Sequence, residues 1–231
     1  MLVILSSGRS GTNILLECFT KNSYYIPTTY PEDKELTKRN IEYPQKYLCK
    51  ADTHYISNYQ EFFDFMVKNQ HCEILWSVRH PYDWCLSKLY RGRPTKSRGY
   101  KIADDATVDG CVEDLTKMYN IYKQAIIDFP LRILVVKMED LLTNIEKEVK
   151  KICNWLGIIY EKEMSTPHLR MRHKGKKERY KTIDKSQIGL YKDIDTIYDG
   201  YFSKRKKTVD KLFNSEIVQT LIKEFKYETN L

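Results

Sequence analysis

Short, almost continuously apolar runs recur along the chain and alternate with segments whose apolar residues follow helical spacing. The runs cover residues 2–6 (LVILS), 47–50, 73–78 (EILWSV) and 132–136 (RILVV). A strand that is apolar on both sides must be buried on both faces, so these runs predict a parallel sheet with helices on each side. We therefore expect an α/β fold, a three-layer sandwich with a central parallel sheet.

Segments with apolar residues three and four positions apart separate these runs and predict helices. The predicted helices begin at Asn13 and Pro81 and cover 57–68, 108–129, 144–156 and two short stretches within 203–228. Ser57 is expected to cap its helix at the N-terminal end, and Gly157 is expected to end the helix that precedes it. Residues 23–45 and 91–106 have the composition of irregular loops.

The length of 231 residues fits one domain, 1–231. We expect a nucleotide-binding α/β core at 1–160, followed by a basic loop and C-terminal helices at 161–231. Lys and Arg exceed Asp and Glu by 39 to 31, a net charge of +8. Such a balance suits an anionic partner, which could be a nucleotide, a nucleic acid, a sulfated glycan or an acidic membrane surface.

The six cysteines show no C-x-x-C pair, which argues against zinc-ribbon and thioredoxin-like sites. Most of them are expected to be free thiols in a reducing compartment. The chain also has neither a signal peptide pattern nor an apolar run of about 18 residues, the length that a spanning helix needs. No membrane span is therefore expected, and the predicted location is cytoplasmic.

A glycine-bearing loop, Ser7 to Asn13 (SGRSGTN), directly follows the first apolar run and precedes a helix. Gly8 and Gly11 let successive backbone N–H groups point inward, and the helix start adds its positive end. Arg9 contributes a fork of donors, while Ser10 and Thr12 contribute hydroxyls. The loop is thus expected to hold a phosphate or sulfate group, as in P-loop nucleotide-kinase-like folds, or else to be a turn that binds nothing.

The loop differs from the nucleotide-triphosphate pattern G-x-x-x-x-G-K-[ST]. Its glycines are three apart, and its basic residue, Arg9, lies between them. A second set follows the third apolar run: Arg79 stands at its end, and Ser87 lies further along the next helix. An arginine there can bind a phosphate bidentately with a hydroxyl beside it. Two anion-binding segments, the glycine loop and the Arg79–Ser87 segment, indicate a ligand with two separated anionic groups.

Four motifs in series resemble the PAPS-dependent sulfotransferase superfamily. Residues 9–13 (RSGTN) are similar to its [KR]-S-G-T-[TNS] loop, and 79–87 to its R-x-P-x-x-x-x-x-S segment. Residues 136–141 (VKMEDL) resemble its strand followed by YEDL, and 154–157 (NWLG) its FLGL. The family's aromatic residue after the first loop and its tyrosine before Glu-Asp are replaced here; these positions are Ile14 and Met138.

The resemblance implies a sulfotransferase that moves a sulfuryl group from 3′-phosphoadenosine 5′-phosphosulfate (PAPS) to a hydroxyl or amine acceptor, leaving adenosine 3′,5′-bisphosphate. It implies that residues 8–13 hold the 5′-phosphosulfate and that Arg79 and Ser87 hold the 3′-phosphate. Arg172, Lys174 and Gly175 are only loosely similar to the family's closing R-K-G segment. They are either a basic lid over that phosphate or a solvated loop. No metal is expected.

The resemblance further implies His54 as the general base and Lys50 as a cation near the transferring group, with Arg9 also stabilising charge. The gap from Lys50 to His54 is wider than the family's K-T-H, and the carboxylates Glu17, Glu32 and Asp52 remain rival bases. A histidine near its ordinary pKa is suited to taking a hydroxyl proton.

The acceptor is expected to be a small molecule or a carbohydrate, and no nucleic-acid partner is expected. Two other functions stay open. One is an ATP-dependent small-molecule kinase with a degenerate phosphate loop, which would need magnesium. The other is a non-catalytic module that binds anions or nucleic acid, with steep salt dependence and no turnover.

Overall fold

The computed structural model describes residues 1–7, 10–27, 36, 46–89, 107–167 and 206–227. Within them lies one five-stranded sheet, in the order β2-β3-β1-β4-β5, and all of its paired strands are parallel. The strands are β1 (Leu2–Ser6), β2 (Ile26–Pro27), β3 (Tyr47–Asp52), β4 (Glu73–Val78) and β5 (Ile133–Lys137). Four of them match the apolar runs of the sequence, which confirms the parallel sheet.

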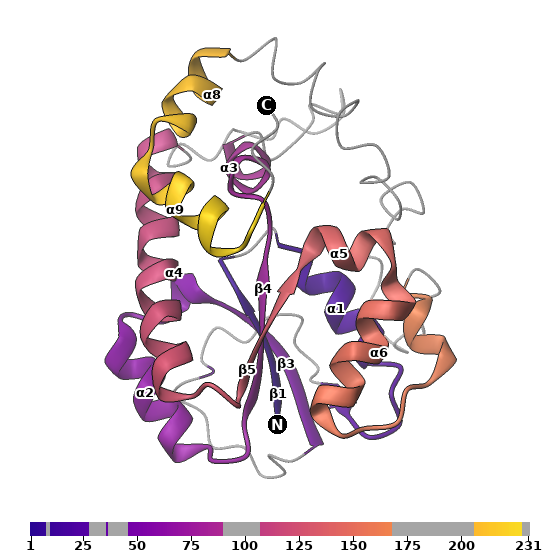
Figure 1. The fold of residues 1–231 in the computed structure, drawn as a ribbon. Helices are drawn as coiled ribbons and strands as arrows, with labels where there is room; N and C mark the ends of the chain where they lie inside the picture. Colours follow the sequence, from indigo (N-terminus) through magenta and orange to yellow (C-terminus); the bar gives the residue numbers. More distant parts are fainter. Residues whose placement is uncertain (8–9, 28–35, 37–45, 90–106, 168–205, 228–231) are drawn as a thin grey trace, which may run out of the picture.

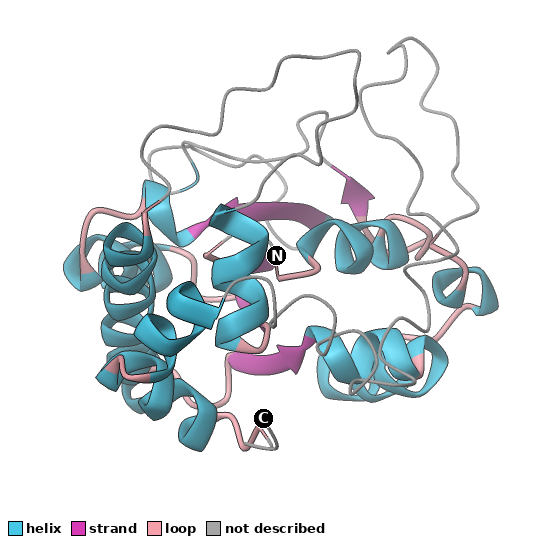
Figure 2. Cartoon of the chain, turned by 90° about the horizontal axis from the view of Figure 1, so that it is seen from above, coloured by secondary structure: helices cyan, strands magenta, loops and turns pink. Residues whose placement is uncertain are grey.

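Helices cover both faces of this sheet (Figures 1 and 2). One layer holds α2, α4 and α9, and the other holds α1, α5 and α6, while α3 lies beyond the end of β4 (Figure 1). The helices are α1 (Thr12–Phe19), α2 (Tyr59–Lys68), α3 (Pro81–Leu89), α4 (Val108–Asp128), α5 (Met138–Thr143), α6 (Ile145–Leu156), α8 (Lys206–Phe213) and α9 (Glu216–Glu224), with 3-10 turns η3 (Thr53–Tyr55) and η4 (Lys162–Ser165). The predicted three-layer α/β sandwich is confirmed.

The central strand β1 shows why its sequence is continuously apolar. Successive side chains of a strand point to opposite faces. Val3 and Leu5 belong to the core on the α2 and α4 side, while Leu2 and Ile4 belong to the core on the α1 and α6 side. All four are fully buried. Because its side chains alternate between two cores, β1 is apolar at every position before its last residue, Ser6.

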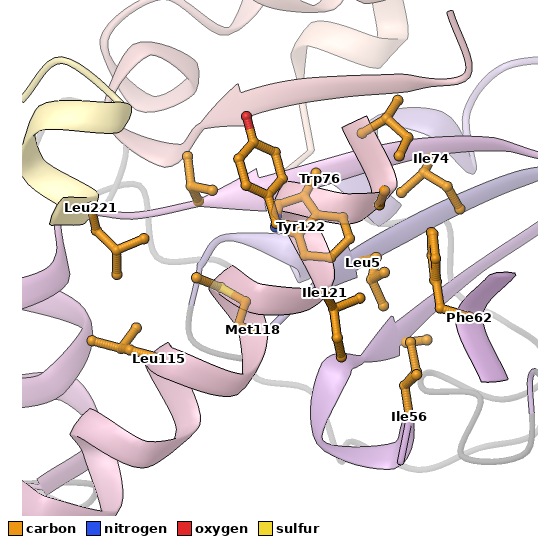
Figure 3. Close-up of a cluster of buried hydrophobic side chains, with 14 of the residues drawn as sticks. Leu5, Ile56, Phe62, Ile74, Trp76, Leu115, Met118, Ile121, Tyr122 and Leu221 are labelled. Carbon is orange, nitrogen blue, oxygen red and sulfur yellow. The ribbon is translucent and has the colours of Figure 1, made fainter. Parts of the chain in front are cut away.

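The core on the α4 side is built around aromatic rings (Figure 3). Trp76 of β4 lies with its ring centroid 5.4 Å from that of Tyr122 on α4 and 6.1 Å from that of Phe62 on α2. Ring pairs at such separations add to the free energy that burial alone contributes. The rings thus join two helices to β4, the strand that directly precedes Arg79.

Element ends differ from the sequence prediction in a few places. Asn58, and not Ser57, caps α2, since its side chain accepts the Glu61 N–H, while the Ser57 N–H donates to the Glu61 carboxylate at 2.7 Å. The short strand β2 and the helix α5 were not expected. Gly157 does end α6, with a left-handed φ of 66°, as predicted.

The two predicted C-terminal helices are present as α8 and α9 and pack on α3 and α4. Phe213 stacks on Tyr82 with ring planes 2° apart, and Gln219 Nε2 donates to the Tyr82 hydroxyl at 3.2 Å. All six cysteines are buried free thiols, also as predicted. None of the described helices combines the length and the apolar character needed to cross a membrane.

Candidate active site

The strand order places a topological switch point beside β1. From β1 the chain continues to β2 and then β3 on one side, and crosses from β3 to β4 on the other. Ligands of such sheets bind outside the carboxyl ends of the strands where the order reverses. The ends of β1, β3 and β4 carry the loop before α1, the turn with His54, and Arg79. Because β1, β3 and β4 are parallel neighbours, these three segments gather at one edge of the sheet.

The described part of the glycine loop is anchored to the sheet. Ser10 is buried, and its carbonyl accepts a hydrogen bond from the Ser77 hydroxyl on β4. Gly11 precedes α1 with a left-handed φ of 79° and accepts from the N–H groups of Ile14 and Leu15. The first N–H groups of a helix, here those of Thr12 and Asn13, have no acceptor within it. They are placed to donate to an anion.

Gly11 also needs to be a glycine for steric reasons. A Cβ at this position would lie 3.0 Å from Cγ of Met138, the first residue of α5. The backbone loop therefore lies directly against the end of β5. Met138 stands where the family motif has a tyrosine, and in this protein its side chain packs against the glycine loop.

Gly11→Ala is expected to lower the free energy of unfolding by about 2 kcal/mol, because a left-handed φ costs roughly 1–2 kcal/mol with a Cβ and Met138 must also move. Gly157→Ala is the matched control, since Gly157 has a φ of 66° and a Cβ added there would meet nothing within 4 Å. Urea unfolding should show a clearly larger loss for Gly11→Ala. Equal losses would contradict the Met138 contact.

Arg79 is held by an ion pair with Asp83 one helical turn further on. Its Nη2 lies 3.0 Å and its Nε 3.3 Å from Asp83 Oδ2, and both side chains are largely buried. Arg79 also borders a small pocket together with Ser7 and Ser10 of the glycine loop. The lining also includes Leu115, Met118 and Leu221, buried core side chains that Figure 3 shows on α4 and α9. The glycine loop and Arg79 therefore border the same pocket.

A buried carboxylate lies behind Arg79. Glu139 of α5 is 9% exposed; its Oε1 accepts the His80 N–H at 2.8 Å, and its Oε2 accepts the Tyr227 hydroxyl at 3.2 Å. Burial raises the pKa of Glu139, while the His80 N–H and the charge of Arg79 act in the opposite direction.

The turn after β3 carries the remaining candidates. Asp52 ends β3, and its Oδ1 accepts the His54 N–H at 3.0 Å, which caps η3. His54 is exposed, with its ring 5.6 Å from that of Tyr55. Lys50 alternates with Cys49, which belongs to the α4-side core, so Lys50 projects from the face that carries α1.

A family model described as "Sulfotransferase family" matches residues 39–162, more than half of the 231-residue chain. The chain belongs to the sulfotransferase family. This confirms the resemblance seen in the sequence motifs. Among curated proteins no sequence matches the chain.

Solved sulfotransferase structures share the fold. The sulfotransferase domain from the curacin biosynthetic pathway superposes with a TM-score of 0.65 at 18% identity, over 99% of this chain and 98% of that one. The sulfotransferase domain of the Synechococcus PCC 7002 olefin synthase gives 0.56 at 16% identity, over 84% and 87%. Mouse sulfotransferase SULT7A1 complexed with PAP gives 0.50 at 20% identity, over 71% and 60%.

Several sulfotransferase-type residues named from the sequence lie outside the described residues: Gly8, Arg9, Glu32, Arg172, Lys174 and Gly175. Ser87 lies on α3 by its backbone, and its side chain is likewise outside the described part. Their roles stay predictions. Within the described residues, no group of three or more His, Cys, Asp or Glu side chains is arranged to hold a metal ion.

Sequence reasoning assigned no site role to Asp83, Glu139 or Tyr227. The spacing of four between Arg79 and Asp83 on one helix start is a readable signal for an ion pair. Tyr227 carries no such signal, because it meets Glu139 across 88 residues of sequence.

Proposed function

We propose that this sulfotransferase-family protein uses PAPS as its sulfuryl donor and a hydroxyl or amine as its acceptor. One observation carries the proposal: Arg79 and the glycine loop, which the family motifs assign to the two ends of the donor, border the same pocket at the switch point. The mouse neighbour, whose fold this chain shares, was solved with PAP, which is the nucleotide that such a donor leaves behind.

The residues present fit the two anionic ends of that donor. The Gly11 backbone, the first N–H groups of α1 and, by its place in the motif, Arg9 would hold the 5′-phosphosulfate. Arg79 would hold the 3′-phosphate with the Ser87 hydroxyl. Asp83 already orders the Arg79 guanidinium at 3.0 Å, so less side-chain freedom is lost when a phosphate binds.

The proposed chemistry is an in-line transfer. His54 would take the acceptor's proton while the acceptor oxygen or nitrogen bonds to sulfur and the bond from sulfur to the nucleotide's phosphate oxygen breaks. Lys50 and Arg9 would stabilise the charge that builds on the oxygens around sulfur. Asp52 would act on His54 indirectly, by capping the turn that carries it.

The acceptor is proposed to be a small molecule or a carbohydrate.

A titration separates this function from its competitors. Adenosine 3′,5′-bisphosphate is expected to bind at least about tenfold more tightly than ATP with magnesium, because only the former places a phosphate for Arg79. Calorimetry at moderate salt measures both. A preference for ATP with magnesium would indicate a kinase and remove the proposed role of Arg79. Binding of neither nucleotide would support the non-catalytic module instead.

A further inference from the structure

Glu139 is a buried carboxylate that the proposed chemistry does not use. It lies in the first turn of α5, directly after β5, and is only 9% exposed. Burying a carboxylate is costly unless hydrogen bonds compensate. Its two oxygens are both engaged, one by the backbone of His80 and the other by the Tyr227 hydroxyl.

The contact with His80 acts on the residue beside it. The His80 N–H belongs to the peptide plane that joins Arg79 to His80, and the orientation of this plane sets the ψ angle of Arg79. Pro81, the next residue, has no N–H to offer. The 2.8 Å hydrogen bond to Glu139 therefore orients the backbone from which the Arg79 side chain leaves β4.

The contact with Tyr227 links the described residues after α9 to the same carboxylate. The Tyr227 ring lies 5.0 Å from the His80 ring, and Lys137 Nζ lies 4.7 Å from the Tyr227 ring centroid. Lys137 Nζ also donates to the Lys226 carbonyl at 3.2 Å, where the backbone has a φ of 51°. A non-glycine residue keeps such a φ when surrounding contacts impose it. Of these residues, only Lys226 and Tyr227 lie beyond the 39–162 match.

We propose that Glu139 is a positioning residue for donor binding: held by Tyr227, it fixes the strand end from which Arg79 reaches the 3′-phosphate. The inference rests on the proposed function, because it assumes that Arg79 binds this phosphate. Glu139 itself would make no contact with the nucleotide. Its effect should therefore appear in the recognition of one phosphate and not in nucleotide binding as a whole.

The test measures the affinity ratio of adenosine 3′,5′-bisphosphate to adenosine 5′-phosphate, which isolates the 3′-phosphate. Glu139→Ala is expected to lower this ratio about tenfold, the size of one impaired charge-assisted hydrogen bond. Glu139→Gln should stay within about twofold of wild type, since its amide oxygen still accepts the His80 N–H. A double variant Arg79→Ala/Glu139→Ala should show no further loss beyond Arg79→Ala alone.

Glu148→Gln and Glu148→Ala are the matched controls, because Glu148 is equally buried at 8% and pairs with Lys151 on α6. Neither should change the ratio. If Glu139→Ala does not fold, Tyr227→Phe carries the test with an expected loss of about threefold. Its control is Tyr119→Phe, whose hydroxyl donates to Glu224 at 3.3 Å.

The wild-type protein tests the proposed function, and the Glu139 and Tyr227 variants test the positioning role. A wild-type protein that does not prefer the bisphosphate overturns the proposed function and, with it, the role of Glu139. A wild-type preference that survives in Glu139→Ala, or in Tyr227→Phe where that variant carries the test, overturns the positioning role alone. An equal loss of affinity for both nucleotides would likewise overturn it, since that pattern indicates a general structural effect.

Discussion

Arg79→Ala is expected to weaken binding of adenosine 3′,5′-bisphosphate by roughly 10- to 100-fold. Hydrogen bonds to a charged group contribute about 1.5–3 kcal/mol, and each 1.4 kcal/mol corresponds to a factor of ten. The variant also removes the positive charge that lies 3.0 Å from the largely buried Asp83 carboxylate in the wild type. The negative charge of Asp83 then repels the phosphate with no guanidinium between them, which adds to the loss.

Calorimetric titration of the variant against the wild type measures this effect, and Arg132→Ala is the matched control. Arg132 lies at the other end of the sheet, where it donates to the carbonyls of Cys72 and Asn69 at 3.0 and 2.6 Å. Its loss should lower the thermal midpoint without changing bisphosphate affinity. An Arg79→Ala protein that binds the bisphosphate as the wild type does would remove Arg79 from the site.

His54→Ala is expected to reduce kcat by about 10²- to 10⁴-fold, the usual contribution of a general base. Bisphosphate affinity should stay unchanged, because His54 is assigned to the acceptor and not to the donor. The measurement follows release of the bisphosphate from PAPS with a panel of acceptors, such as 4-nitrophenol, a primary amine and a simple sugar, using whichever supports turnover.

Asp52→Asn distinguishes the base from its neighbour. Asparagine still caps a turn, so the His54 N–H keeps its acceptor and the turn is expected to hold its shape. If His54 is the base, Asp52→Asn should retain most of the wild-type kcat. A large loss in Asp52→Asn together with a mild one in His54→Ala would make Asp52 the base.

Much of the fold follows from local patterns in the sequence. Val3 and Ile4 point into different cores, and a strand in this situation is recognisable because its residues are apolar at successive positions, here from Leu2 to Leu5. Gly157 ends a helix because glycine adopts a left-handed φ at no steric cost, and that preference is visible in the chain. The choice of Asn58 over Ser57 as a cap was not visible, since both residues can cap and only the helix geometry decides.

In the candidate site, too, some residues could be predicted from the sequence and others could not. Arg79 could be named in advance because it stands where an apolar run stops, and the carboxyl ends of parallel strands meet at one edge. The support behind it could not be named in advance. Glu139 and Tyr227 are ordinary residues in their own surroundings, and their partnership spans 88 residues.

The sequence by itself therefore determined the parallel sheet, the order of its loops and the arginine at the end of β4, because burial on two faces and strand-end turns impose local patterns on the chain. Only the tertiary structure decided which residues support that arginine. The partners of the buried Glu139 carboxylate come from segments that are distant in sequence and that pack against it in the fold. In this protein those segments are the end of β4 and the residues after α9.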